Sequence, residues 1–505
     1  MSNFYITTPI YYVNDRPHIG HFYTTIIADV IARYHRLIGD KVLFLTGTDE
    51  HSSKTVNAAT ENNTTPKEWA DKQSESFKDA FAFANISHDV FARTSDQKHI
   101  LNVQKYIQRM IDNEFVYEGV YEGWYDQSQE EYISDSDAEV NGYKSLITEK
   151  PLEKRQEPCY YFKLSVFQNF LLELYNKRDF VYPVERLNEI RERVKLGLRD
   201  VPISRLISKN NSNWGIPFPG NPEHVAWVWA DAIYNYFSFI DNDEYRDFWP
   251  ANVHCIAKDI LWFHAVIWPA MALASNIEIP NKIYSHSFWV RDSKKMSKSL
   301  GNFVGLDDIK KYSEIYGIDA IRYYLAVYGP AEATDRNFSE SHLQEIYNSD
   351  LANTIGNCVS RVLHMFRKAF GTNEDKFVVS YNPDSSLDQT LGKDYKDAMS
   401  NLNIAKASKL ALYIFENINK DIDKKKPFSL INNKETFEEA KDILLGYIKD
   451  MRLASALLHP IMPDKSSAMM DSLGKLIIND NLMNEKKDFE FFNVATQPLF
   501  PRIKS

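Results

Sequence analysis

The sequence predicts an α/β protein in which a parallel sheet is interrupted by an inserted lobe and followed by a bundle of helices. Three observations predict this order. The N-terminal residues read as strand, helix and strand; a turn-rich, aromatic stretch then breaks the pattern; and the C-terminal third is almost wholly helical. At 505 residues the chain exceeds one ordinary domain, since domains usually run to about 100 to 200 residues.

The N-terminal unit has a βαβ pattern. Residues 4 to 13 form an apolar run typical of a buried strand. Residues 21 to 38 read as a helix with one apolar face, made of Ile26, Ile27, Val30, Ile31 and Tyr34. Gly39 ends this helix, and the apolar strand KVLFLT follows. Such a unit begins a Rossmann-type sheet, which binds ligands at the C-terminal ends of its strands.

The pattern changes at about residue 117. The pieces YEGVYEGWY, CYYFKLS and WGIPFPG are strand-like and turn-rich, which is typical of an inserted lobe. Beyond residue 225, WVWADAIYNYFSF and DILWFHAVIWPAMA are patterned as helices, and VHCIA and KIYSHSFWV as strands. We therefore expect residues 1–116 and 226–290 to form the two halves of one α/β domain, with 117–225 inserted between them.

The C-terminal region reads as a helical domain over residues 345–505, joined to the α/β domain by a region at 291–344. One face of the segment from 353 to 366 is apolar and includes Ile355, Cys358, Val359, Val362, Leu363 and Phe366. The opposite face is polar, with Asn353, Asn357, Ser360 and Arg361. Later helices are expected at roughly 388–418 and 435–458, the second ended by HPIMP.

Composition excludes several classes of protein. No apolar run approaches the ~20 residues that cross a bilayer, so we expect no membrane span. The N-terminus enters a strand without an export signal, and the three cysteines are too scattered for a disulfide framework or a metal knuckle. A cytoplasmic protein is expected. The net charge of −10 argues mildly against a dedicated nucleic-acid binder, and basic stretches at 186–199 and 424–426 are either solvated helix faces or phosphate patches.

Two short motifs carry the chemistry: PHIGH at 17–21, between the first strand and helix, and KMSKS at 295–299, after a late strand. Each alone has an ordinary explanation. His18 and His21 are then helix-capping or surface histidines, and KMSKS is a solvated turn. The pair, in this order around an interrupted Rossmann pattern, resembles the class I aminoacyl-tRNA synthetases.

The chemistry of that family explains the residue types. A carboxylate displaces pyrophosphate in line at the α-phosphorus of ATP, and the charge that develops on phosphoryl oxygens must meet fixed donors. His18 and His21 supply donors at a helix N-terminus, and Gly20 lets the nucleotide approach the backbone. Lys295 and Lys298 suit the leaving pyrophosphate. ATP and Mg²⁺ are the expected cofactors.

Nearly the whole chain resembles the methionyl-tRNA synthetases. The stretches that carry the resemblance are TPIYYVNDRPHIGH, LTGTDEH, VWADAIYNYFSF, HCIAKDILWFHAVIWPAM and KKMSKSLGN. The resemblance implies that Asp49 holds the α-ammonium of methionine and that Lys258 and Asp259 bind ATP. The methionine pocket it implies consists of Ile10, Tyr12, Trp229, Ala232, Ile233, Tyr236, Ile260, His264 and Trp268.

The residues themselves permit this pocket but also a simpler explanation. Trp229, Ala232, Ile233 and Tyr236 share one helix stripe, and Ile260, His264 and Trp268 recur at i, i+4 and i+8 on another. Taken alone, both stripes are more often plain core. A histidine between two apolar residues, however, needs a polar partner if it is buried, and a thioether pocket accounts for it. Asp49 is either a ligand at a strand end or surface decoration, and Asp259 either binds the ribose of ATP or favours a helix dipole.

The chain also departs from the family. Ala257, Ser52 and Ser287 stand where glycines are usual, and the insertion lacks the cysteine knuckles of many members, so no structural zinc is expected. The helical domain resembles the family's anticodon-binding domain, which implies that Asn357, Arg361 and Phe428 read the anticodon. Phe428 replaces a usual tryptophan and is otherwise a core residue after Pro427. No dimer-forming appendix is seen, so a monomer is expected.

The implied function is activation of L-methionine by ATP and its transfer to methionine tRNA, initiator and elongator. Other class I synthetases remain an alternative. Those for valine, isoleucine and leucine are far longer, and the cysteine enzyme needs a zinc-thiolate pocket whose ligands this chain lacks. A tRNA-binding protein that kept only the fold, or a nucleotidylyltransferase with a similar histidine motif, is a further alternative. The intact motifs argue against the first, and the helical domain argues against the second.

Overall fold

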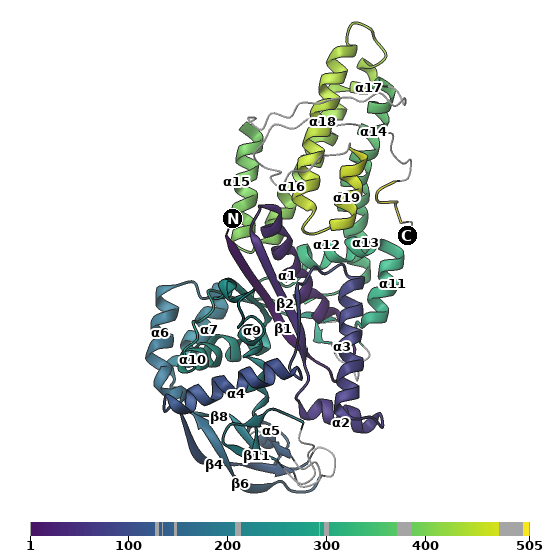
Figure 1. Cartoon of the computed structure of the whole chain (residues 1–505). Helices are drawn as coiled ribbons and strands as arrows, with labels where there is room; N and C mark the ends of the chain where they lie inside the picture. The colour runs from purple at the N-terminus through teal and green to yellow at the C-terminus, as the bar shows by residue number, and fades with distance from the viewer. Residues whose placement is uncertain are drawn as a thin grey trace.

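The computed structural model describes residues 2–126, 131–133, 135–145, 149–207, 214–291, 293–296, 302–370, 386–473 and 498–503. In Figure 1 the C-terminal helices stand at the top, the sheet that begins with β1 and β2 lies in the middle, and the inserted lobe lies at the bottom. The predicted architecture of an α/β domain, an insertion and a helical region is thus what the chain adopts.

A six-stranded parallel sheet forms the centre of the molecule, in the order β3-β2-β1-β12-β13-β7. Its strands are β1 (Asn3–Tyr12), β2 (Lys41–Asp49), β3 (Val90–Arg93), β7 (Val181–Tyr182), β12 (Val253–Ala257) and β13 (Ile283–His286). The helix α1 (Ile19–Leu37) connects β1 to β2, and Gly39 follows it with a positive φ of 91°. The N-terminal βαβ prediction is therefore confirmed.

Both faces of this sheet are buried, as parallel sheets require. Successive residues of β1 point to opposite sides: Phe4 and Ile6 belong to one hydrophobic core, and Tyr5 to the other. The core on the α1 side continues into the C-terminal helices without a break. The other core lies beneath the helices that follow β3 and β12, and it reaches into the inserted lobe.

The lobe between β3 and β12 contains two small antiparallel sheets. One has the order β5-β4-β6-β8 and the other β10-β11-β9. Their strands are β4 (Val116–Asp126), β5 (Glu131–Ile133), β6 (Glu153–Phe162), β8 (Val201–Pro202), β9 (Ser204–Leu206), β10 (Pro217–Phe218) and β11 (Asn221–Ala226). The strand β7, although it falls inside the predicted insertion, pairs with β13 and extends the main sheet. The helix α7 (Val184–Lys195), which follows β7, therefore lies beside the sheet.

The helices around the sheet are α2 (Ser53–Glu61), α3 (Pro66–Phe83), α4 (Gln97–Asp112), α6 (Gln168–Lys177), α8 (Val228–Ala232), α9 (Asn235–Ser238) and α10 (Trp268–Ala274). The segment before α10 is not a regular α-helix. It begins with a 3₁₀ turn at Lys258–Ile260 and continues through a π-helical turn at Phe263–Ile267. A π turn holds more residues than an α turn, so it rotates every following side chain relative to a 3.6-residue pattern.

A small sheet and two helices join the α/β domain to the helical domain. The sheet has the order β15-β14-β16, with β14 at Trp289–Arg291, β15 at Lys294–Lys295 and β16 at Arg336–Asn337. The helices are α11 (Leu306–Tyr316) and α12 (Ile318–Tyr328). None of the described helices is long and apolar enough to span a membrane.

The helical domain begins with α13 (Glu340–Ile346) and a π-helical stretch at Tyr347–Gly356. It continues with α14 (Asn357–Phe370), α15 (Ser386–Ser400), α16 (Ile404–Lys425), α17 (Pro427–Leu430), α18 (Phe437–Leu458) and α19 (Pro463–Ser472). The single helix expected at 388–418 is two, because the chain turns at Leu402 with a positive φ of 59°. The apolar face expected between 353 and 366 is buried at Ile355, Cys358, Val359, Val362 and Phe366.

A buried ion pair ties the two domains together. Arg322 of α12 is fully buried, and its guanidinium contacts the Asp29 carboxylate of α1 at 2.7 Å. The same guanidinium donates to the carbonyls of Ala84, after α3, and Ile461, before α19, at 3.0 Å each. Burial opposes ionisation of Asp29, but Arg322 and Arg33 outweigh it and keep the pKa of that carboxyl below its ordinary value.

Replacing Arg322 with methionine should therefore destabilise the protein strongly. The substitution leaves the Asp29 charge buried with fewer partners and removes the guanidinium donor from the carbonyls of Ala84, Pro460 and Ile461. Removing one member of a buried pair costs about 3–5 kcal/mol. Urea unfolding measures this loss. Lys177→Met, which removes an exposed ion pair with Glu173, should change nothing measurable. A comparable small effect for Arg322→Met would show that the two domains do not depend on this contact.

Candidate functional site

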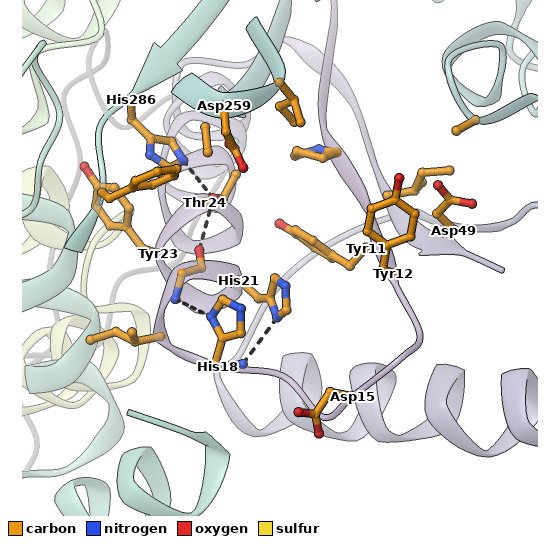
Figure 2. Close-up of a pocket in the computed structure, with 18 of the residues that line it drawn as sticks. Tyr11, Tyr12, Asp15, His18, His21, Tyr23, Thr24, Asp49, Asp259 and His286 are labelled. Carbon is orange, nitrogen blue, oxygen red and sulfur yellow. Dashed lines mark hydrogen bonds between the residues drawn. The ribbon is translucent and has the colours of Figure 1, made fainter. Parts of the chain in front are cut away.

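A cavity of about 490 Å³ lies at the C-terminal ends of β1, β2, β12 and β13. Its walls come from five parts of the chain: residues 9–24, Asp49, residues 229–236, residues 257–264, and residues 286–289 with Met296 and Phe303. In Figure 2, Tyr12 and Asp49 lie at one end of the cavity and Tyr23, Thr24 and His286 at the other. Open α/β sheets bind ligands at this edge, so the cavity is the candidate site.

The histidine motif forms the N-terminus of α1. His18 is the N-cap residue, and its Nδ1 accepts a hydrogen bond from the Gly20 backbone N–H at 3.1 Å. The backbone N–H of His18 in turn donates to Nδ1 of His21 at 3.3 Å, and the two rings stack with centroids 3.8 Å apart (Figure 2). Burial and the neighbouring His18 lower the pKa of His21 well below its usual value. His21 is therefore a neutral ring at neutral pH.

Gly20 is required by this packing. A Cβ at position 20 would lie 2.9 Å from Cε1 of His18 and 3.1 Å from its Nδ1. No ordinary Cβ contact is that short, so any larger residue would displace the imidazole. The glycine thus permits the His18 cap as well as a close approach of a ligand to the backbone.

The histidine motif contacts residues that follow the KMSKS motif in the chain. The Ile19 backbone N–H donates to the Val304 carbonyl at 3.1 Å, and His18 forms a β-bridge with Gly305. Arg16 contacts the Asp307 carboxylate of α11 with both terminal nitrogens, each at 3.0 Å. The backbone of Lys295 pairs with Val290 in the β14–β15 ladder, and Met296 lines the cavity. Lys298 and the side chain of Lys295 lie outside the described part of the chain.

The other half of the cavity is largely apolar and aromatic. Of the predicted methionine pocket, it brings together Ile10, Tyr12, Asp49, Trp229, Ala232, Ile233, Tyr236, Ile260 and His264. His264 has the polar partners that its burial requires: its Nδ1 contacts the Ile260 carbonyl at 2.9 Å, and its Nε2 contacts the Tyr236 hydroxyl at 2.7 Å. Burial lowers the pKa of His264 to about 4. The ring is thus neutral, with Nδ1 as donor and Nε2 as acceptor from the tyrosine.

Trp268 does not take part in this wall. It is fully buried behind Tyr236, with ring centroids 6.3 Å apart, and its Nε1–H donates to His254 at 3.3 Å. The i, i+4, i+8 spacing placed it beside His264 only for a regular α-helix. The π-helical turn between them rotates Trp268 away from the cavity and into the core.

Asp49 ends β2 as an almost fully buried carboxylate. Its Oδ1 has no hydrogen-bond partner among the described residues. Burial, Asp231 and Glu50 raise the pKa of Asp49 well above its ordinary value, and the His51 backbone N–H opposes them. A cationic ligand would remove this unfavourable balance, so the carboxylate is arranged to bind a positive charge.

Sequence reasoning missed a group of polar residues behind Asp49. The Asp231 carboxylate is held by Nδ1 of His51 at 2.7 Å and by Nε2 of His99 at 2.8 Å. Glu50 is paired with Arg93, whose Nε lies 2.7 Å from Oε1. His99 and Arg93 come from segments that carry no motif. Burial of a histidine would have been the one signal for His99, and the sequence gives no signal for Arg93.

Lys258 and Asp259 are placed differently. Asp259 lines the cavity. Lys258 is not among the lining residues, because its ammonium contacts both oxygens of Asp335, at 2.7 and 2.9 Å. Other lining residues were not predicted, among them Arg16, Thr24, His286, Phe288 and Trp289. His286 belongs to the unusual segment HSF, and its Nε2 lies 2.7 Å from the Thr24 hydroxyl.

The residues predicted to read an anticodon belong to two helices of the helical domain, Asn357 and Arg361 to α14 and Phe428 to α17. Figure 1 shows both helices in the upper part of the molecule. Asn357 is exposed. Arg361 is half-buried and contacts the Asp423 carboxylate at 2.6 Å. Phe428 is 47% exposed, which is high for a phenylalanine. Within the described ranges, no group of three or more His, Cys, Asp or Glu side chains is placed to hold a metal ion.

Comparison with known proteins identifies close relatives. The family model for class I tRNA synthetases (M) matches residues 4–143 and 137–363. The methionine–tRNA ligase of Rickettsia conorii is 38% identical over 490 residues, covering 94% of this chain and 93% of that protein. The corresponding ligase of a Nostoc species is 36% identical and covers 98% of this chain and 94% of that protein. A structure of Mycobacterium tuberculosis methionyl-tRNA synthetase with methionyl-adenylate is 32% identical, has a TM-score of 0.87 and covers 99% of this chain.

The unfavourable burial of the Asp49 charge predicts that Asp49→Asn stabilises the ligand-free protein. When folding raises the pKa of a carboxyl, ionisation of that carboxyl lowers the free energy of unfolding. This loss is absent below the unfolded pKa of 3.8 and is complete above the folded pKa. The asparagine variant should thus gain about 1 kcal/mol or more at pH 8, and less at pH 5. Melting curves at both pH values measure the difference. A loss of stability that is equal at the two pH values would show that Asp49 carries no electrostatic penalty.

Proposed function

The chain belongs to the class I methionyl-tRNA synthetases, and we propose that it uses its cavity for the reaction of that family. L-methionine and ATP form methionyl-adenylate and pyrophosphate, and the methionyl group is then esterified to the 3′-terminal adenosine of methionine tRNA, initiator and elongator. One observation carries the proposal: the histidine-capped N-terminus of α1, the buried carboxylate of Asp49 and a ring of aromatic side chains face a single cavity.

The α1 side of the cavity binds the nucleotide. The helix N-terminus presents backbone N–H groups and a positive dipole end to phosphate. The rings of His18 and His21 have polar edges for the oxygens that gain charge as the methionine carboxylate attacks the α-phosphorus. Lys295 and Lys298 of the KMSKS segment attract the leaving pyrophosphate. Asp259 holds the ribose hydroxyls, and Mg²⁺ enters with ATP as its phosphate counterion. Lys258, paired with Asp335, supports this half from outside the cavity.

The opposite side of the cavity binds methionine. Asp49 pairs with the α-ammonium, which supplies the missing partner of its Oδ1. The thioether lies among Tyr12, Trp229 and Tyr236, where sulfur makes favourable contacts with aromatic rings. The hydroxyl of Tyr236 is committed to His264, and the pair therefore keeps a fixed polar edge in an otherwise apolar pocket. Such an arrangement orients the carboxylate toward the nucleotide half.

The helical domain reads the CAU anticodon through Asn357, Arg361 and Phe428. The exposure of the Phe428 ring supports this role over the alternative of a core residue, because a ring available to solvent can stack on an unpaired base. We further infer a monomeric, cytoplasmic enzyme that works without structural zinc. We assign catalysis to residues 1–116 and 226–290, which are separated by the insertion at 117–225. Residues 291–344 link this domain to the anticodon-binding domain at 345–505.

Methionine should support exchange of pyrophosphate into ATP, whereas leucine, isoleucine and cysteine should not. A pocket shaped by aromatic rings distinguishes an unbranched thioether from a branched chain by shape and sulfur contacts. Strongest exchange with another amino acid would overturn the assignment.

His21→Ala should lower the exchange rate by about a hundredfold while leaving methionine affinity nearly unchanged, since the lost donor acts in the transition state.

Phe428→Ala should weaken aminoacylation of methionine tRNA by about 1–3 kcal/mol, the scale of one base stacked on a ring. Methionine-dependent pyrophosphate exchange and the melting temperature should stay unchanged. Tyr413→Ala is a matched control, because Tyr413 is another exposed ring of the same domain, 51% accessible on α16. A fall in melting temperature, or a defect independent of the anticodon sequence, would remove Phe428 from the anticodon site.

A further inference from the structure

The segment after β13 forms the wall of the cavity on the α1 side. Ser287 and Phe288 line the cavity, and the adjoining His286 contacts Thr24 of α1 at 2.7 Å. Ser287 is fully buried. Its backbone N–H donates to the Pro330 carbonyl at 2.9 Å. The wall thus faces the phosphate-binding end of α1 rather than the aromatic half.

Arg186 reaches this wall from the first turn of α7. One terminal nitrogen of its guanidinium donates to the Ser287 hydroxyl at 3.0 Å and to the Ala333 carbonyl at 2.9 Å. The other donates to Glu189 at 2.8 Å. The side chain is only 14% exposed. A guanidinium buried to this degree costs free energy unless its donors are used, and the serine hydroxyl accepts one of them.

The next residue of the wall is fixed by a second charged group. The Phe288 backbone N–H donates to Oδ1 of Asp335 at 2.9 Å, and Asp335 is paired with Lys258. The Lys258 ammonium also lies over the Phe288 ring, 4.8 Å from its centroid. Arg186 and Asp335 therefore hold two successive residues of the cavity wall from behind, one through a side chain and the other through the backbone.

We propose that Arg186 is a positioning residue for ATP, acting through the hydroxyl of Ser287. The contact fixes the wall at 287–288 at the position that the nucleotide needs, and it links this wall to α7, which returns from the inserted lobe to the edge of the sheet. Serine at position 287 supplies an acceptor that glycine lacks. The inference rests on the proposed function, because it takes the α1 side of the cavity as the nucleotide half.

The test compares Ser287→Ala with Ser285→Ala in methionine-dependent pyrophosphate exchange. Both serines are fully buried at the end of β13, but no hydrogen bond of the Ser285 hydroxyl is present among the described residues. Ser287→Ala should raise KM for ATP about 3- to 10-fold while leaving KM for methionine within about twofold. Arg186→Lys, which keeps the charge but loses the planar fork, should do the same. The double variant should be no worse than Arg186→Lys alone, because both substitutions remove the same contact between Arg186 and Ser287.

Three results would overturn the inference. One is an unchanged KM for ATP in Ser287→Ala. Another is an equal rise in KM for ATP and methionine together with a lower melting temperature, which would indicate a merely structural contact. The third is an equal effect of Ser285→Ala. Absence of methionine-dependent exchange in the unaltered enzyme would instead reject the proposed function, so the two failures are distinguishable.

Discussion

The buried contact between Arg322 and Asp29 determines how the two halves of this protein sit together. Asp29 lies within α1, whose N-terminus carries the motif histidines, and Arg322 lies on the last helix before the helical domain. The guanidinium also binds carbonyls that precede α19. Because each of these groups is buried, none has water as an alternative partner, and the contact holds only when all the elements are in place. The position of α1 is therefore fixed relative to the C-terminal helices.

The charged side chains beside the cavity are also buried and need partners. Three carboxylates meet near the end of β2, and such a group is unfavourable away from water. Glu50 is compensated by Arg93, and Asp231 by two histidines. Asp49 alone keeps an oxygen without a partner in the described structure. The neighbouring charges are thus neutralised, and the Asp49 carboxylate is left as the one of the three that can pair with a cationic ligand.

Distant segments of the chain form the α1 side of the cavity. The loop before α1 is joined to the start of α11 through backbone contacts and the Arg16–Asp307 ion pair. From the opposite side, the inserted lobe returns through β7 and α7 and reaches the wall at Ser287. The insertion is thus part of the frame of the site, and a movement of α7 would be transmitted directly to the cavity wall.

The sequence by itself determined the fold class, the family and most of the cavity. The spacing of apolar residues reflects which local side chains are buried, and the two motifs have the residue types that the reaction requires. The elements and the motifs can therefore be recognised from the sequence alone. Tertiary structure alone decided the remainder. The π-helical turn places Trp268 in the core and not in the cavity wall. The ion pair with Asp335 holds the Lys258 ammonium outside the cavity. The strand β7 lies within the insertion in sequence but pairs with the main sheet. His99, Arg93 and Arg186 act through partners far away in the chain. Their roles depend on which side chains face them after folding, and no local pattern encodes that.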